Sequence, residues 1–268
     1  MTSVSANKSL QSDNLRGVAC VHTRCAPICS TQAPPHKFRL SEALGLKRCS
    51  VRIIFVEGMP GCGKSTLSDK LSAMIREKGH DSFSHQELDK THPVYVLRDK
   101  EKDIDSVQYL NNYLDAWGSF AKSYSHENEI HIFDATPFQS FIRFAIEAGN
   151  SERCSGYLSK LENTLSGISS SIIYLRPECP MKQTDYCILK RGEAWGSKVS
   201  SYVESTHLSR KYGWIGVAGM RCFWEHYVLI CDSLLSEIKM PKKVIRTVPG
   251  EWGRVQEEAF SFVDKQIA

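Results

Sequence analysis

The sequence contains the stretch Gly58-Met59-Pro60-Gly61-Cys62-Gly63-Lys64-Ser65-Thr66, which fits the pattern G-x-x-x-x-G-K-S. The apolar run at 51–56 comes directly before it and predicts a buried strand. Apolar residues recur at helical spacing after it, at Leu67, Leu71, Met74 and Ile75. Gly79 stands where that helix should stop. The sequence therefore predicts a strand, a glycine-rich turn and a helix in direct succession.

The residue types in this turn are those of a loop that binds phosphate groups. Gly61 and Gly63 can adopt backbone conformations closed to other residues, so that successive N–H groups point at an anion. The helix from Lys64 adds the positive end of its dipole, and the Lys64 side chain can reach the outer phosphates. Ser65 offers a hydroxyl to Mg²⁺. We therefore expect ATP and Mg²⁺ as ligands, and the predicted contacts are Gly58, Gly61, Cys62, Gly63, Lys64, Ser65 and Thr66.

Composition restricts the class of partner. With 268 residues, 41% of them hydrophobic, the chain can bury a sizeable core, and its apolar runs are too short to cross a bilayer. The net charge of +4 arises in residues 1–50, which hold seven lysines and arginines against Asp13 and Glu42. Because the rest is nearly neutral, we expect a small-molecule acceptor and neither a nucleic-acid partner nor a membrane span.

The first 50 residues are expected to be a leader outside the catalytic domain, which would span residues 51–268. They are rich in Ser, Thr, Ala, Arg and Lys, poor in acids, and without regular periodicity, as in disordered segments. This composition is also similar to an organellar transit segment and lacks the apolar core of a secretory signal, while a nonconserved tail remains the alternative. We expect a cytoplasmic protein, or an organellar one if residues 1–50 are a transit peptide.

Ten scattered cysteines are predicted to be free thiols. One of them, Cys62, lies inside the glycine-rich turn, and a loop that needs Mg-ATP suits a reducing compartment. His22, Cys25 and Cys29 are close in sequence, but no second pair completes four zinc ligands at the usual spacing. We predict no zinc site there.

The rest of the chain alternates strands with helices. Further strands are predicted at 81–86, 130–134, 171–175 and 243–248, and helices at 104–124, 138–149, 154–167, about 180–190, 223–238 and 252–262. The residues from about 191 to 216 are polar and contain glycine, and we expect them to form a mobile loop that acts as a lid. Strands that are apolar runs indicate a parallel α/β sheet covered on both faces, with ligands at the carboxyl ends of the strands.

Asp134 ends the third predicted strand. A carboxylate in this position beside a phosphate loop holds Mg²⁺ directly or through water, so we predict Ser65 and Asp134 as the metal site. Asp134 also suits the N-cap of the helix that starts at Phe138, and the two roles are compatible.

Three residues are predicted to be catalytic: Lys64, Asp89 and Arg191. Asp89 follows the second strand and is placed to accept the proton of an attacking hydroxyl, with Glu87 as the rival and a simple turn-capping role as the alternative. Arg191, in the basic stretch that leads into the polar segment, is predicted to stabilise charge on the transferred phosphoryl group.

Three segments together resemble the thymidylate kinase-like branch of the P-loop nucleoside and nucleotide kinases. They are Glu57-Gly58-x-x-Gly61-x-Gly63-Lys64-Ser65-Thr66, the strand that ends at Asp134, and Ile173-Tyr174-Leu175 followed by Lys190-Arg191-Gly192. The resemblance runs from about residue 51 to the end. It implies a P-loop NTPase fold, with a five-stranded parallel sheet in the order 2-3-1-4-5, helices on both faces and a lid containing Arg191. It also implies that adenine lies near Arg191 and the loop after the fifth strand.

We therefore expect an ATP-dependent kinase that acts on a small-molecule or nucleotide-like hydroxyl. One alternative is a sugar-nucleotide or antibiotic kinase that resembles zeta toxin or chloramphenicol phosphotransferase, and another is a P-loop ATPase without an acceptor. A guanine-nucleotide switch is excluded because no N-K-x-D tetrad occurs. The sequence leaves open the acceptor and the oligomeric state, a homodimer included.

Overall fold

A computed structural model describes residues 52–87, 89–97, 106–123 and 129–267. All of these belong to the unit Lys47–Ala268. The predicted leader at 1–50, with His22, Cys25 and Cys29, lies outside the described residues.

Five strands form one parallel sheet. They are β1 (Ile53–Gly58), β2 (Asp81–His85), β3 (Glu129–Asp134), β4 (Ser170–Pro177) and β5 (Lys242–Thr247). Their order is β2-β3-β1-β4-β5, and every neighbouring pair is parallel. The prediction of a five-stranded parallel sheet in the order 2-3-1-4-5 is therefore confirmed. Because β1 is central, it is paired on both sides and all six of its residues are buried.

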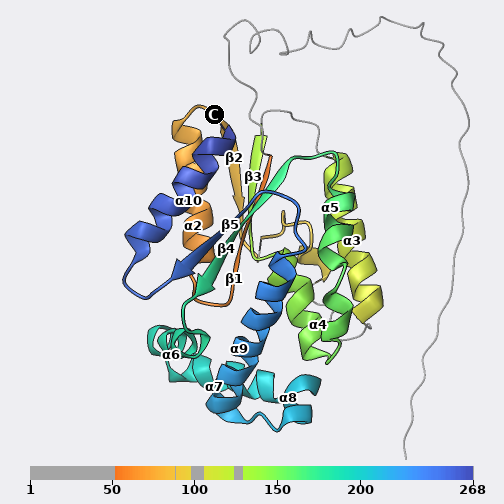
Figure 1. Ribbon diagram of the computed structural model, residues 1–268, viewed down its shortest axis with the longest axis vertical. Helices are drawn as coiled ribbons and strands as arrows, with labels where there is room; N and C mark the ends of the chain where they lie inside the picture. The colour runs from red at the N-terminus through yellow and green to blue at the C-terminus, as the bar shows by residue number, and fades with distance from the viewer. Residues whose placement is uncertain (1–51, 88, 98–105, 124–128, 268) are drawn as a thin grey trace, which may run out of the picture. The chain divides into compact units, whose positions relative to one another are not determined.

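Helices cover both faces of the sheet (Figure 1). One face carries α2 (Lys64–Glu77) and α10 (Trp252–Ile267). On the other side lie α3 (Ser106–Ser123), α4 (Arg143–Glu147), α5 (Tyr157–Thr164) and α9 (Gly216–Leu235). Short helical turns complete the connections: η1 (Tyr95–Leu97), the π-helix η2 (Pro137–Ile142) and η3 (Ser151–Cys154).

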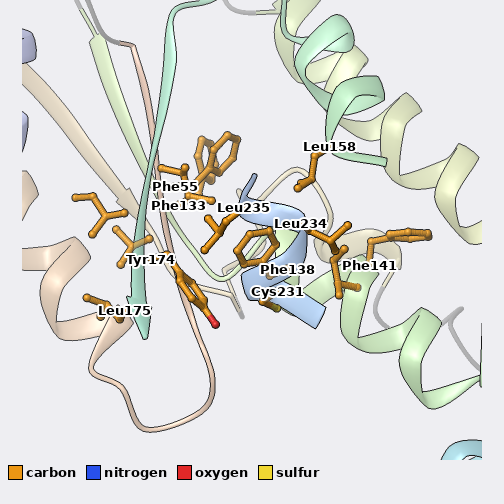
Figure 2. Close-up of a cluster of buried hydrophobic side chains, with 14 of the residues drawn as sticks. Phe55, Phe133, Phe138, Phe141, Leu158, Tyr174, Leu175, Cys231, Leu234 and Leu235 are labelled. Carbon is orange, nitrogen blue, oxygen red and sulfur yellow. The ribbon is translucent and has the colours of Figure 1, made fainter. Parts of the chain in front are cut away.

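The core between the sheet and α9 is built from aromatic and aliphatic side chains of β1, β3 and β4 (Figure 2). The rings of Phe138 and Tyr174 meet edge to face, with centroids 5.4 Å apart. Phe55 and Phe133 lie side by side on neighbouring strands, with centroids 6.1 Å apart. This packing fixes η2 against the sheet, and η2 begins only three residues after the end of β3.

The chain beyond the carboxyl end of β4 is helical, so the prediction of a loop at 191–216 is wrong. The segment forms α7 (Glu193–Glu204) and α8 (His207–Tyr212), after α6 (Pro180–Arg191). The buried face of α7 consists of Gly196, Ser200 and Val203, whose small or polar side chains hide the usual apolar periodicity. A Cβ at Gly196 would lie 3.1 Å from a methyl group of Ile188, so α6 and α7 approach closely because this residue has no side chain.

The described residues also bear on membranes and disulfides. Within them, no helix combines the length and the hydropathy that crossing a bilayer requires. The cysteines of this part of the chain are free thiols, in agreement with the prediction: Cys62, Cys154, Cys179, Cys187, Cys222 and Cys231.

Candidate functional site

The glycine-rich turn, here called the glycine loop (residues 58–66), joins β1 to α2. Gly61 and Gly63 have φ values of 80° and 87°, in the left-handed region that favours glycine. Steric space demands glycine at both positions, since a Cβ at Gly61 would overlap Cys187 Sγ and one at Gly63 would overlap the Trp252 ring. Gly63 is the N-cap of α2, and the first turn of that helix holds no acidic residue. The positive end of the helix dipole is thus not neutralised within its own first turn.

Lys64, Ser65 and Asp134 meet at the start of α2. Lys64 is 7% exposed, and its Nζ atom donates to the Met59 carbonyl oxygen at 3.4 Å. The Ser65 hydroxyl donates to Asp134 Oδ2. The position of Asp134 is set by the sheet, because Val56 of β1 pairs with it, and by a sharp turn at Ala135, whose φ of 64° is unusual for a residue other than glycine.

This pair suits a magnesium ion. Asp134 Oδ1 is buried and has no hydrogen-bond partner among the described residues. A buried carboxylate oxygen without a partner is costly unless a ligand satisfies it. Carboxylate and hydroxyl oxygens are the donors that Mg²⁺ prefers, so the chemistry of Ser65 and Asp134 fits the metal predicted from the sequence.

A cleft with a volume of about 640 Å³ opens beside these residues. It is lined by residues of the glycine loop between Pro60 and Thr66 and by Asp134. Glu87 after β2, Gln139 of η2, Arg143 and Glu147 of α4 and Tyr202 of α7 also line it. Arg191 and Trp195 line the cleft as well, and the guanidinium of Arg191 lies over the Trp195 ring, 4.9 Å from its centroid.

A second cavity, of about 320 Å³, also borders the glycine loop. It is lined by Gly61 and Gly63, by Tyr186 of α6, and by residues 247–250 and Trp252 after β5. The resemblance to thymidylate kinase-like proteins implies that adenine lies near the loop after β5. That loop therefore lines a cavity that also borders the glycine loop. Arg191 lines only the first cleft among these two.

The Cys62 side chain faces the protein interior. It is 5% exposed, and its sulfur receives a hydrogen bond from the Thr247 hydroxyl at 3.8 Å. Burial raises the pKa of the Cys62 thiol to about 12. Cys62 nevertheless lines the second cavity, and only a small part of the residue is exposed to a ligand there.

Asp89 and Glu87 lie in different surroundings. The Asp89 carboxylate is exposed and accepts a hydrogen bond from the Gln86 N–H at 3.0 Å, which makes it the cap of its own turn, and it does not line the cleft. Glu87 lines the cleft, and its Oε2 atom accepts from Gln139 Nε2 at 3.1 Å. Of the two carboxylates that the sequence offers as the base, Glu87 lines the cleft and Asp89 does not.

Glu57 is a functional candidate that was not among the site residues predicted from the sequence. It is fully buried at the end of β1, where Oε1 accepts from the Phe138 N–H at 2.8 Å and Oε2 from the Gly58 N–H at 3.3 Å. The start of η2 is thus capped by Glu57 and not by Asp134. Burial raises the pKa of Glu57 to about 8, against the lowering effect of its two amide donors and of Lys64. The sequence did contain a signal for Glu57, because an acidic residue at the end of an otherwise apolar, buried strand is costly unless it has a specific role.

Three further cleft residues carried no sequence signal of their own. Gln139, Glu147 and Tyr202 come from η2, α4 and α7, and only the folded chain brings them together. Arg143 joins them through a hydrogen bond from Nη1 to Glu147 Oε1 at 2.6 Å. The Tyr202 hydroxyl donates to Glu147 Oε2 at 2.7 Å.

No family model matches the chain, and no curated protein matches it. Solved structures with a similar fold include APE1195, with 12% sequence identity and a TM-score of 0.46 over 82% of this chain and 99% of that chain. Another is the thymidylate kinase from Candida albicans, with 11% identity and a TM-score of 0.48 over 82% of this chain and 93% of that chain.

Proposed function

We propose that the chain is an ATP-dependent phosphotransferase, a P-loop kinase that moves the terminal phosphoryl group of ATP to a hydroxyl of a small molecule. The observation that carries the proposal is one continuous cleft of about 640 Å³ between the glycine loop and Glu87, Arg143 and Glu147. A triphosphate tail held by the loop would occupy only part of that volume. The remainder is lined by polar side chains and by Trp195, Val199, Val203 and Trp224, and room for a second substrate favours a kinase over an ATPase that needs none.

The triphosphate would be held by main-chain N–H groups of the glycine loop and by the first turn of α2. Lys64 would exchange its bond with the Met59 carbonyl, which at 3.4 Å is long, for the outer phosphates. Ser65 and Asp134 would hold Mg²⁺, which neutralises phosphate charge when bound. The cavity between Tyr186 and the loop after β5 would take the base.

For the transfer step, the acceptor hydroxyl attacks the terminal phosphorus while the bond from that phosphorus to the bridging oxygen breaks, leaving ADP. The hydroxyl proton passes to the carboxylate of Glu87, which Gln139 orients. Lys64 and Arg191 stabilise negative charge on the transferred group. Phosphoryl transfer needs little covalent help, so these groups act mainly by position and charge.

The test is phosphoryl transfer from terminally labelled ATP to a panel of hydroxyl compounds, with binding of Mg-ATP measured by calorimetry. Replacing Lys64 with alanine should weaken Mg-ATP binding about tenfold to a hundredfold, because it removes a charge-assisted contact. Transfer should fall by about a hundredfold or more. The control is Lys70→Ala, an exposed lysine on the same helix, which should match the wild type.

Wild-type Mg-ATP affinity in the Lys64→Ala protein would contradict the role of the glycine loop. Hydrolysis of ATP at the same rate with and without every acceptor would instead favour the ATPase alternative.

A further inference from the structure

Five polar residues that line the cleft outside the glycine loop, Glu87, Gln139, Arg143, Glu147 and Tyr202, are here called the acceptor half. Arg191 lines the same cleft but is assigned above to the transferred phosphoryl group. The acceptor half contains two carboxylates and one guanidinium. A triphosphate bound in the loop would add further negative charge beside it. Which acceptor fits this half depends on whether its one cation is available to a ligand.

The Arg143 guanidinium is committed to protein partners. Nη1 donates to Glu147 Oε1 at 2.6 Å and to the Tyr202 hydroxyl at 3.2 Å, while Nε donates to the Gln139 carbonyl at 3.1 Å. The side chains of Arg143 and Glu147 are only 17% and 9% exposed. A phosphate group that bound Nη1 or Nε of Arg143 would compete with Glu147 and the Gln139 carbonyl, and weakening the ion pair of a carboxylate that is 9% exposed is unfavourable.

The remaining groups of the acceptor half accept hydrogen bonds. Gln139 uses Nε2 to bind Glu87, so its Oε1 atom is an acceptor, and this atom is buried without a partner among the described residues. Gln139 is itself 9% exposed. The Glu87 carboxylate has only acceptor positions. A ligand that satisfies these atoms must donate, as hydroxyl and ammonium groups do and a phosphate dianion does not.

We propose that the acceptor is an unphosphorylated polyhydroxyl compound, that an amine on it improves binding, and that phosphomonoesters are excluded. This inference rests on the proposed function, because it identifies the second substrate of the same cleft. It makes a nucleoside monophosphate the wrong acceptor for this chain. The reason is the ion pair of Arg143 with Glu147, together with the unpaired acceptor atom of Gln139.

The test uses compounds that differ by one amino or phosphate group: glucosamine, glucose and glucose 6-phosphate, and the pairs thymidine with dTMP and adenosine with AMP. Calorimetry measures their binding to the full chain saturated with magnesium and a non-hydrolysable ATP analogue. Within each set, the phosphorylated member should bind at least about tenfold more weakly than its parent, because like charges oppose it. Glucosamine should bind more tightly than glucose. Tighter binding of any phosphorylated member than of its parent would overturn the proposal.

The second part of the experiment uses Glu147→Gln, which removes the negative charge that forms an ion pair with Arg143. Affinity for glucose 6-phosphate and dTMP should rise about tenfold, the effect of one charged hydrogen bond. Tyr202→Phe should raise the affinity for these phosphomonoesters by a smaller factor. Because Tyr202 is 46% exposed, this variant should fold even if Glu147→Gln does not, and so keeps the test valid. Glu257→Gln removes an equal charge from the exposed side of α10 and should change nothing. Unchanged phosphomonoester affinity in both cleft variants would refute the role of Arg143.

The binding arm separates this inference from the proposed function. Suppose that the ATP analogue binds and each phosphorylated compound binds more weakly than its parent, yet no compound ever receives a phosphoryl group. The kinase proposal then fails, while the inference that phosphomonoesters are excluded stands. If transfer occurs and dTMP or AMP is the best acceptor, the kinase proposal stands and the inference fails.

Discussion

Two carboxylates follow β2 within three positions of each other, and their neighbours decide what each can do. Asp89 receives the N–H of Gln86 and is exposed, so its charge serves the turn. Glu87 lies in the cleft, where its carboxylate accepts a hydrogen bond from the side-chain amide of Gln139. Leu88 between them is outside the described residues. Residues two positions apart in an extended strand lie on the same side, but here the chain turns, with the Asp89 N–H bonded to the Gln86 carbonyl oxygen, and the two side chains have different neighbours.

Replacing each carboxylate by its amide should separate these roles. Glu87→Gln should lower kcat by about a hundredfold, the usual contribution of a general base, and leave Mg-ATP binding within about twofold. Asp89→Asn should keep kcat within about threefold, because an asparagine oxygen can still cap the turn. Steady-state kinetics with the best acceptor of the panel measure both. The reverse result, a large loss for Asp89→Asn and none for Glu87→Gln, would restore Asp89 as the base.

At the scale of elements, the close contact between α6 and α7 positions the part of the cleft contributed by Arg191, Trp195 and Tyr202. The contact depends on Gly196, where a Cβ would meet Ile188 at 3.1 Å. Small residues allow two helices to approach closely, at the expense of the apolar pattern by which helices are recognised.

Gly196→Val should therefore separate α6 from α7. Overpacking at a tight helix contact costs about 1–3 kcal/mol, so we expect a loss of that size in the free energy of unfolding, together with weaker acceptor binding. Gly253→Val on α10 is the matched control, since a Cβ there meets no atom within 4 Å. Urea unfolding followed by fluorescence measures both variants. Equal stability of the two would mean that the helix contact is not tight in solution.

At the scale of the whole molecule, Glu57 connects the central strand to the acceptor half. It binds the N–H of Gly58 in the glycine loop and the N–H of Phe138 in η2, which carries Gln139. Its pKa is raised from 4.5 to about 8 because it is buried. The histidines His85 and His131, which share a hydrogen bond of 2.8 Å at the edge of the sheet, change in the opposite sense, since burial lowers the pKa of each to about 4.

These groups predict how stability depends on pH. Folded Glu57 holds its proton up to about pH 8, whereas the unfolded chain releases it near 4.5, so its stabilising contribution is complete below 4.5 and is lost as pH rises toward 8. Between pH 6.5 and 8 the free energy of unfolding should fall by up to about 1.4 kcal/mol per pH unit from this group.

The histidine contribution is complete above pH 6.5 and is lost as pH falls toward 4, so the window from 6.5 to 8 isolates Glu57. Urea unfolding at several pH values in this window, for the wild type and for Glu57→Gln, measures the slope. The variant should show little slope because its amide does not titrate. Parallel curves for the two proteins would show that Glu57 is already ionised at neutral pH.

Much of the fold was predictable because it depends on local pattern. The apolar runs of β1, β3 and β4 and the glycine motif at residues 58–66 can be recognised from neighbouring residues alone, whereas the edge strands β2 and β5 are largely polar. The small-residue face of α7 was not predictable in this way, because close packing replaces hydrophobic side chains there.

By itself, the sequence determined the alternation of strands and helices and the glycine loop, since each is encoded by neighbours in the chain. The contact of Ser65 with Asp134, 69 positions apart, was expected from the order of the two motifs and is made by the pairing of β1 with β3. Only the tertiary structure decided which carboxylate faces the cleft and that Arg143 is held by Glu147 and Tyr202. These contacts join residues from η2, α4, α7 and the turn after β2. Their charges interact through space, and the distances that set those interactions exist only after the helices pack.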